Sequence, residues 1–228
     1  ITLTLSMNCI ILFSMPHATP TQQFRALELL QKQGMVRLSE FIQVGITAAT
    51  VSRMKQKGLL CQLGRGLYQL PNAPLETHHS LAHATKVVPH GVICLTSALA
   101  FHGLTDTIAA RVWIAIGPKA RRPTATQPPM QIVRFGLKAL RAGIEVHDIE
   151  GVSVKIYKPA KTVVDLFRYR YPAGRRFKKS PGLALAIEGL REALRTRMAT
   201  PAELVRFARA TGIEKVLTPY LDALTENA

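Results

Sequence analysis

The sequence predicts an α+β protein, with an N-terminal unit of short helices and one β-hairpin followed by a mixed α/β domain with a helical C-terminal segment. Three observations favour this class. Residues 47–70 show a helical spacing that changes into two extended runs around a glycine turn. Short apolar runs between residues 111 and 157 read as strands, and residues 182–225 return to a helical spacing. The 228 residues suffice for two modest hydrophobic cores.

The first unit begins with two helices joined by a short strand. Residues 21–33 have a helical pattern that Gly34 closes, and residues 35–36 start a strand. Ser39 is expected to cap a second short helix, EFIQV. The side chains expected to face inward are Phe24, Ala26, Leu27 and Leu30 in the first helix and Phe41 and Val44 in the second.

A third helix is predicted over residues 47–57. Thr47 can cap its first free backbone amides, and Gly58 supplies the positive φ that ends it. The side chains expected on its inner side are Val51, Met54 and Lys55. Its outer side is therefore polar and basic.

The hairpin after this helix completes a motif. Residues 59–63 and 67–70 form two extended runs, with Arg65 at the tip of the glycine turn between them. Three helices followed by a basic hairpin are typical of a winged helix-turn-helix. Residues 21–70 are therefore assigned to a winged helix-turn-helix DNA-binding domain, and a three-helix scaffold that binds another protein is the alternative.

The outer side of the third helix predicts how this domain contacts DNA. Because the major groove admits one helix, its first two turns are expected to contact bases and phosphates. Arg53 suits a bidentate contact with guanine, Gln56 suits adenine, and Arg65 suits the minor groove or a phosphate. The expected DNA-binding residues are Thr47, Ala49, Thr50, Ser52, Arg53, Gln56, Lys57 and Arg65. A solvated polar face is the alternative for each of them.

Residues 1–20 are expected to be an apolar extension outside the folded units. The run LTLSMNCIILFS has no basic flank and is shorter than the ~20 apolar residues of a membrane helix. Because the chain opens on Ile1 and carries Met15, we expect a start-site artefact, with the working protein beginning near Met15. A signal peptide is the alternative, and no membrane partner is expected from the rest of the chain.

The three cysteines bear on the compartment. Cys9, Cys61 and Cys94 are far apart, odd in number and form no C-x-x-C pair. This pattern argues against a disulfide framework and a zinc knuckle. It indicates a reducing cytosol, so a cytoplasmic protein is expected.

Residues 71–77 are predicted to be a linker, because Pro71 and Pro74 remove backbone donors that a helix or a strand requires. Residues 78–228 then form the second domain, a small mixed sheet with flanking helices that ends in helices over residues 182–225. The proline-rich loop GPKARRPTATQPP within it is expected to be mobile and to pack no core.

Two further features of this domain carry specific expectations. His79 and His83 lie four residues apart, a spacing that can hold a metal, but no acidic or cysteine ligand is near in sequence. An amphipathic helix without a metal is therefore favoured. Pro219 is expected to break or kink the last helix.

Four motifs follow one another between Thr21 and Tyr171: the wing GRGLYQLP, then CLTSALAFHGL, WIAI and YKPAKTVVDLFRY. In this order they resemble the AbiEi antitoxins of bacterial abortive-infection (type IV) toxin-antitoxin systems. The resemblance implies an antitoxin that represses its own operon by binding inverted repeats of double-stranded DNA, while its second domain neutralises a nucleotidyltransferase toxin. It places DNA reading on residues 47–57 and Arg65, and it assigns the antitoxic role to no single residue. The sequence after Arg175 departs from the family pattern.

The charge predicts a polyanionic partner. Net charge is +16, from 30 basic and 14 acidic residues, and residues 111–181 alone hold sixteen basic and four acidic ones. The basic surface expected to contact DNA or a partner comprises Lys119, Arg121, Arg122, Arg168, Arg170, Arg175, Arg176, Lys178 and Lys179. A solvated basic face is the alternative. Binding to inverted repeats calls for two copies, so a homo-oligomer on DNA is expected.

A nuclease is the rival enzyme class. A metal-dependent nuclease requires an acid and then an acid-x-lysine on neighbouring strands, for which Asp148, Glu150 and Lys155 are the nearest candidates. Ser153 stands where the second acid is required, so no enzymatic activity, metal or cofactor is expected. A winged-helix regulator whose second domain senses a ligand or another partner is the remaining alternative.

Overall fold

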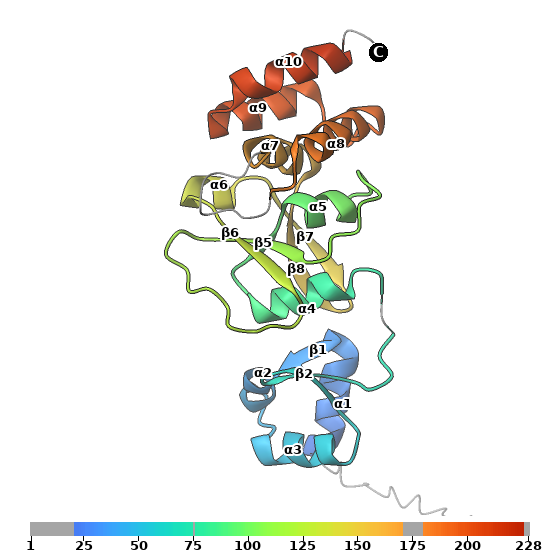
Figure 1. Ribbon diagram of the computed structural model, residues 1–228. Coiled ribbons are helices and arrows are strands. Elements are labelled where there is room, and N and C mark those ends of the chain that lie inside the picture. The colour runs from blue at the N-terminus through green and yellow to red at the C-terminus, as the bar shows by residue number, and fades with distance from the viewer. Residues whose placement is uncertain (1–20, 75, 171–179, 226–228) are drawn as a thin grey trace, which may run out of the picture.

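The computed structural model describes residues 21–74, 76–170 and 180–225 and has the predicted α+β class. A small unit of helices α1–α3 with a three-stranded sheet lies at one end (Figure 1). A five-stranded sheet with flanking helices occupies the middle, and helices α8–α10 lie at the other end. The expected extension over residues 1–20 lies outside the described residues.

The N-terminal unit contains three helices and a short sheet. Its elements are α1 (Gln22–Gln33), β1 (Met35–Arg37), α2 (Leu38–Gln43), α3 (Ala48–Gln56), β2 (Cys61–Gly64) and β3 (Leu67–Gln69). The strands pair antiparallel in the order β1-β3-β2, with β1 added beside the predicted hairpin. The helices and this sheet enclose a core that includes Leu30, Phe41 and Val51.

Some side chains of this unit lie differently from expectation. Phe24 is 53% exposed, because it is two residues from the buried Ala26 and therefore about 200° away around α1. Val44 is 46% exposed, because α2 ends before it. Ser39 does not cap α2, because the helix already begins at Leu38. Its N-cap is Arg37, whose backbone N–H donates to the Glu40 carboxylate.

The second unit is built on a mixed sheet in the order β6-β5-β4-β8-β7. Its elements are α4 (His79–Val87), β4 (Val92–Ile93), α5 (Leu95–Phe101), β5 (Val112–Ile116), β6 (Met130–Arg134), α6 (Leu137–Arg141), β7 (Ile144–Ile149), β8 (Val152–Tyr157) and α7 (Pro159–Arg168). Pairs β4–β8 and β5–β6 are parallel, whereas β4–β5 and β7–β8 are antiparallel.

Both faces of this sheet are covered. Because side chains alternate along a strand, Ile114 and Ile156 join the apolar cluster under α4, whereas Ala115 and Tyr157 join the cluster under α5 and α7. The short helix α6 was not expected from the sequence, since it buries no side chain of its own. The proline-rich loop between β5 and β6 is partly packed, contrary to expectation, because Pro128 is buried and Ala120 contacts the cluster under α4.

Three helices complete the chain and pack beside α7: α8 (Leu183–Arg195), α9 (Pro201–Thr211) and α10 (Glu214–Thr225). A capping box between Thr200 and Glu203 starts α9. Helix α10 continues through Pro219, so of the expected break or kink, the break is wrong. Pro219 faces solvent, while Leu217 and Leu221 on either side of it are buried and hold the helix in place.

The N-terminal unit contacts the sheet at a close seam, by which we mean Gly34, Gly151 and their immediate neighbours. A Cβ atom at Gly34 would lie 2.0 Å from the backbone oxygen of Glu150, and one at Gly151 would lie 2.6 Å from the backbone oxygen of Lys32. Beside the seam, Met35 is buried within the cluster under α4. The two backbones therefore meet without side chains between them.

Two polar contacts flank the seam. Lys86 Nζ on α4 donates to both carboxylate oxygens of Glu40 on α2, at 2.9 and 3.1 Å. The Glu150 carboxylate lies 2.8 Å from His79 Nδ1 and also accepts the backbone N–H of Glu76 at 2.9 Å. The linker and α4 are thus tied to the same turn between β7 and β8.

A buried ion pair lies between α7 and the sheet. Lys161 Nζ donates to Asp165 Oδ2 one turn later, and both side chains are 0% exposed. The ammonium also lies 4.6 Å from the centre of the Tyr157 ring, which is a cation–π contact. Burial raises the pKa of Asp165 and lowers the pKa of Lys161, so each charge depends on its partner.

We expect Lys161→Ala to lower the free energy of unfolding by about 3–5 kcal/mol, because it leaves a buried carboxylate unpaired. The double substitution Lys161→Met with Asp165→Leu should cost less than the single one, since no buried charge remains. Urea unfolding monitored by circular dichroism measures both, with the exposed Lys215→Ala as a control expected within about 0.5 kcal/mol of the parent protein. A double variant less stable than Lys161→Ala would contradict this account.

We expect Gly34→Ala to destabilise the protein by at least about 2 kcal/mol more than Gly58→Ala. Both glycines have positive φ, +61° and +71°, so both substitutions carry similar backbone strain. Only at Gly34 does the new methyl group meet the backbone oxygen of Glu150, whereas the space beside Gly58 is open. Equal losses for the two variants in thermal unfolding would argue against a close seam.

Candidate nucleic-acid interface

Helix α3 lies at the end of the N-terminal unit that is farthest from the five-stranded sheet (Figure 1). The Thr47 hydroxyl accepts the backbone N–H of Thr50 at 3.3 Å, which confirms the predicted cap. The inner side of the helix consists of Thr50, Val51 and Met54, which are 8%, 0% and 2% exposed. The helix therefore presents its opposite side to solvent.

The exposed side of α3 carries most of the side chains that the sequence analysis proposed for DNA. Exposed positions of that set are Thr47, Ala49, Ser52, Arg53, Gln56 and Lys57. Thr50 is the exception. It was expected on the exposed side of the helix, but its side chain is buried. Lys55, expected on the inner side, is exposed instead, because the buried side of the helix is formed by Thr50, Val51 and Met54.

Gln22, at the start of α1, holds the start of α3 in place. Its Oε1 atom accepts the backbone N–H of Thr47 at 3.0 Å, the Thr47 hydroxyl at 3.2 Å and the Thr50 hydroxyl at 2.8 Å. A polar hollow of about 380 Å³ opens beside this contact, and Arg53 and Lys57 line it together with Gln22. Gln22 could not be identified from the sequence, because residues 25 positions apart carry no shared spacing signal.

A second contact connects α3 to the hairpin. Lys55 Nζ donates to Gln62 Oε1 at 2.5 Å, and Gln62 Nε2 donates to the backbone oxygen of Gly64 at 3.0 Å. The pairing of β2 and β3 shifts register between Gln62 and Gly64, at the approach to the turn. Arg65 follows in that turn and is exposed, as predicted. The orientation of the turn is thus coupled to a side chain of α3.

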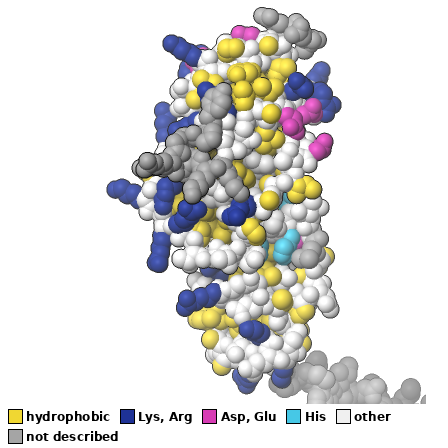
Figure 2. Space-filling view, in the orientation of Figure 1, with side chains coloured by type: hydrophobic (Ala, Val, Ile, Leu, Met, Phe, Trp, Pro, Cys, Tyr) yellow, Lys and Arg dark blue, Asp and Glu magenta, His cyan; other side chains and the backbone are white. Residues whose placement is uncertain are grey.

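The charges around α3 are almost all positive. Figure 2 shows Lys and Arg side chains at the lower end of the visible face, and the acidic side chains of that face lie nearer the other end. Within residues 21–70, only Glu28 and Glu40 are acidic, and Glu40 is already bound to Lys86. A polyanion approaching α3 therefore meets an uncompensated positive surface.

The basic surface expected on the second domain divides into two described groups. Lys119, Arg121 and Arg122 are exposed on the loop after β5. Arg168 is exposed at the end of α7, whereas Arg170 is partly buried and donates to the backbone oxygen of Phe167 at 2.6 Å. Leu137 on α6 borders hollows next to both groups, so α6 lies between them. The remaining members, Arg175, Arg176, Lys178 and Lys179, lie outside the described residues.

The carboxylates considered for a nuclease have other partners. Asp148 Oδ1 accepts the backbone N–H of Gly151 within the β7–β8 turn at 3.0 Å, and Glu150 binds His79 and the linker. His79 and His83 come together on α4, with ring centres 6.3 Å apart. Among the residues that the structure describes, no three His, Cys, Asp or Glu side chains are placed to share a metal.

The first comparison with known proteins concerns the N-terminal unit. Residues 25–71 match the model of the family described as transcriptional regulator, AbiEi antitoxin. The match runs from α1 to the end of the hairpin, and it confirms the resemblance for this segment.

In the described ranges, no helix combines the length and apolar character that crossing a membrane requires.

The fold as a whole is similar to that of a solved structure. The crystal structure of the RV2827C protein from Mycobacterium tuberculosis superposes with a TM-score of 0.59 at 16% sequence identity, over 89% of this chain and 77% of that one. At this identity the similarity concerns the fold alone. No curated protein matches the chain.

We expect Gln22→Ala to lower the free energy of unfolding by about 1–2 kcal/mol, because it removes the acceptor shared by Thr47 and Thr50. Gln23→Ala is the matched control, since Gln23 is exposed, and it should change stability by less than about 0.5 kcal/mol. Chemical unfolding of the two variants tests the difference. Equal stabilities would mean that Gln22 does not hold α3.

Proposed function

We propose that the protein is an antitoxin and autorepressor whose N-terminal unit, residues 21–70, is a winged helix-turn-helix that binds operator DNA. Helix α3 enters the major groove, and the β2–β3 hairpin is the wing, with Arg65 at a phosphate or in the minor groove. In this proposal Thr47, Ala49, Ser52, Arg53, Gln56 and Lys57 face the DNA. Thr50 supports the helix from inside.

The observation that carries the proposal is the exposed basic side of α3, held next to a basic hairpin, within the segment that matches the AbiEi regulator family. A core helix would bury that side, and a helix that binds an apolar partner would expose aliphatic side chains there. Positive and hydrogen-bonding side chains instead suit phosphates and base edges.

The remaining residues are proposed to carry the antitoxic role. In this division, residues 71–77 are the linker and residues 78–228 form the domain that neutralises a nucleotidyltransferase-type toxin in the cytoplasm. The basic group at Lys119, Arg121 and Arg122 adds contacts with DNA or with the partner. Because an inverted repeat has two-fold symmetry, two copies of the protein bind each operator.

The alternative is a winged-helix regulator whose second domain senses a ligand and has no toxin. A cavity beside the β5–β6 loop favours this candidate. The presence of a nucleotidyltransferase-like reading frame next to the gene supports the antitoxin, and its absence supports the regulator.

The experiment that tests DNA reading is a mobility-shift titration on the DNA upstream of the protein's own gene, with scrambled DNA as the competitor, at two salt concentrations. Preference for the upstream DNA that persists at the higher salt supports sequence reading. Equal and strongly salt-dependent binding to both DNAs would mean that the positive charge acts alone, and would contradict the repressor.

We expect Arg53→Ala to weaken operator binding by about 1–3 kcal/mol and to relax the preference at one base pair, because a bidentate contact is lost. Arg206→Ala on α9 removes the same charge far from α3 and should leave affinity unchanged. Fluorescence anisotropy on the operator and on single-base variants measures both effects. Unchanged affinity on every sequence would show that α3 is not the reader.

Neutralisation is tested separately, by co-expressing the chain with the adjacent nucleotidyltransferase and measuring bacterial growth. If DNA reading and neutralisation use different parts of the chain, Arg53→Ala rescues growth as well as the parent protein does. The transcript level of the toxin must be set by an external promoter, so that loss of repression does not affect the result.

A further inference from the structure

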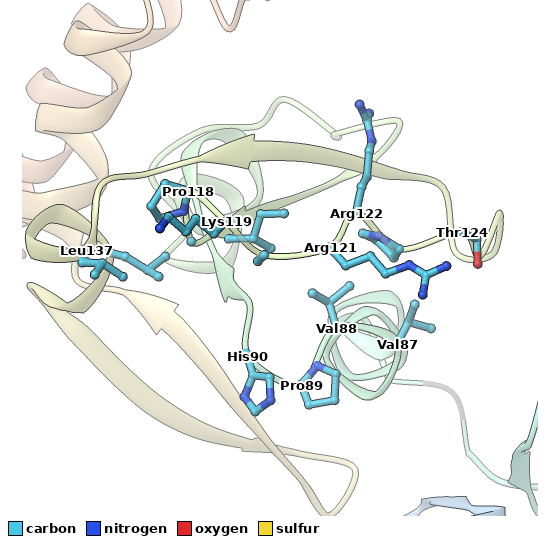
Figure 3. A pocket seen from close by; sticks show the side chains of 15 residues that line it. Val87, Val88, Pro89, His90, Pro118, Lys119, Arg121, Arg122, Thr124 and Leu137 are labelled. Carbon is cyan, nitrogen blue, oxygen red and sulfur yellow. The ribbon is translucent and has the colours of Figure 1, made fainter.

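A cavity of about 780 Å³ lies between the end of α4, the loop after β5, and α6. This volume is within the range of about 300–1,000 Å³ that is usual for small-molecule sites. Figure 3 shows Val87 and Val88 at the end of α4, Leu137 on α6, and the loop of Lys119 and Arg121 around the space. The cavity is distinct from the exposed side of α3 and from the hairpin turn.

The wall of the cavity combines aliphatic and cationic side chains. Val87, Val88, Ile116, Leu137 and Leu140 supply an apolar surface. Lys119, Arg121 and Arg122 stand at its edge, and none of them forms an ion pair with a described residue. Within the part of the chain that the structure describes, no Asp or Glu lines the cavity.

The composition of the cavity wall indicates which class of ligand it can bind. A phosphate backbone is polar throughout and is bound on open, solvated surfaces, whereas this site is concave and mainly apolar. A molecule with an apolar body and one anionic group satisfies both parts of the wall, because its body covers the aliphatic side chains while its anion pairs with a guanidinium. A neutral ligand would cover the aliphatic side chains without pairing with a cation.

The same loop also borders the hairpin. A smaller hollow of about 250 Å³ is lined by Arg37, Gly64 and Arg65 on one side and by Pro123 and Thr124 of the loop on the other. Val87, Pro123 and Thr124 line both hollows. A ligand that reorders this loop therefore changes the surroundings of Arg65.

We propose that this cavity binds a small amphipathic anion, an organic carboxylate, sulfonate or phosphate with an apolar body, and that its occupancy changes DNA affinity through the loop and the hairpin. Arg121 is the principal anion contact, because Figure 3 shows it extended over the end of α4 while Arg122 points away. The second half of the proposal rests on the proposed DNA-binding function, whereas the first half does not.

The test of the site uses the fluorescent probe 8-anilinonaphthalene-1-sulfonate, an aromatic sulfonate, titrated into the full chain. One probe per chain should bind, and Arg121→Glu should raise its dissociation constant about tenfold or more, because an attractive charge becomes repulsive. Leu137→Glu should also raise it, since Leu137 is 57% exposed and the substitution places an anion on the cavity wall without disturbing the core.

Lys138→Glu is the matched control. It makes the same change of charge as Arg121→Glu on the residue after Leu137, but Lys138 lines a different hollow. Its dissociation constant for the probe should stay within about twofold of that of the parent protein. Thermal unfolding verifies that all three variants are folded. Equal probe affinity in Arg121→Glu, Leu137→Glu and the parent protein would overturn the site.

The test of the coupling repeats the operator titration at increasing probe concentration. Coupling predicts that the operator dissociation constant reaches a plateau once the site is saturated, and that Arg121→Glu loses this response. A constant that keeps rising without a plateau would mean direct competition with DNA, and no change would mean no coupling; either result overturns this half. Failure to bind operator DNA at all would refute the proposed function and leave the probe titration as the test of the site.

Discussion

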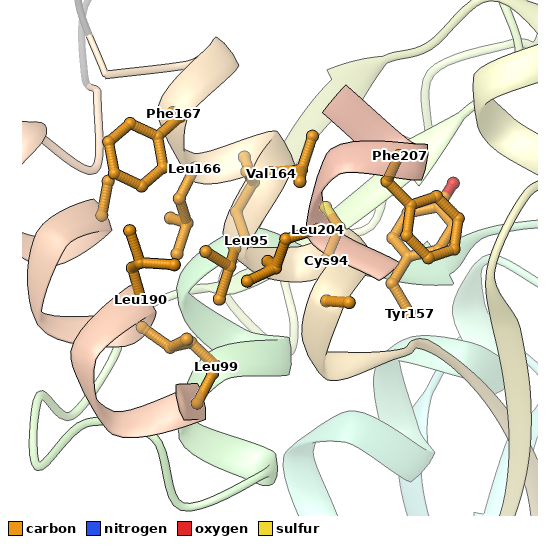
Figure 4. Close-up of a cluster of buried hydrophobic side chains, with 14 of the residues drawn as sticks. Cys94, Leu95, Leu99, Tyr157, Val164, Leu166, Phe167, Leu190, Leu204 and Phe207 are labelled. Atoms are coloured by element: carbon orange, nitrogen blue, oxygen red, sulfur yellow. The ribbon is translucent and has the colours of Figure 1, made fainter. Parts of the chain in front are cut away.

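The buried pair of Lys161 and Asp165 is the interaction on which the larger unit depends. It lies on α7, which packs against the five-stranded sheet on one side and against α8–α10 on the other. Figure 4 shows how side chains from α5, α7, α8 and α9 meet in this layer, among them Leu99, Leu166, Leu190 and Leu204. An unpaired charge at this place would destabilise the packing of both sides at once, because burial forbids hydration of either group.

Around this pair, the five-stranded sheet lies between two ends with different surfaces. The helical end carries balanced charge, whereas the end with α3 carries an almost uncompensated positive one. Such a distribution gives a polyanion one preferred end at which to bind, and it leaves the other end free for a contact that does not depend on salt. This arrangement is consistent with one chain that serves DNA and a protein partner.

Local signals predicted much of this structure. Thr47 and the glycines after α1 and α3 predicted where helices begin and end, because caps and positive φ act within a few residues. The strands between residues 111 and 157 were predicted from short apolar runs. The errors occur where tertiary contacts determine the structure. Thr50 is buried because its hydroxyl donates to Gln22, and α10 continues through Pro219 because the buried Leu217 and Leu221 hold both of its halves.

Only part of the candidate nucleic-acid interface could be predicted from the sequence. The exposed residues of α3 and Arg65 could be named from helical spacing and turn chemistry, although their function stays a proposal. Gln22, the Lys55–Gln62 contact and the cavity at Arg121 could not be named, since each joins segments whose proximity depends on the complete fold.

The close seam at Gly34 and Gly151 has a consequence for the geometry of an operator complex. The two backbones are in direct contact there, and the ion pair of Lys86 with Glu40 joins the two units beside the seam, so the N-terminal unit has little room to turn relative to the sheet. If two copies bind an operator as proposed, the seam fixes the distance and angle between their α3 helices within the protein. The length of the spacer between half-sites would then affect affinity, independently of any side-chain contact with the spacer.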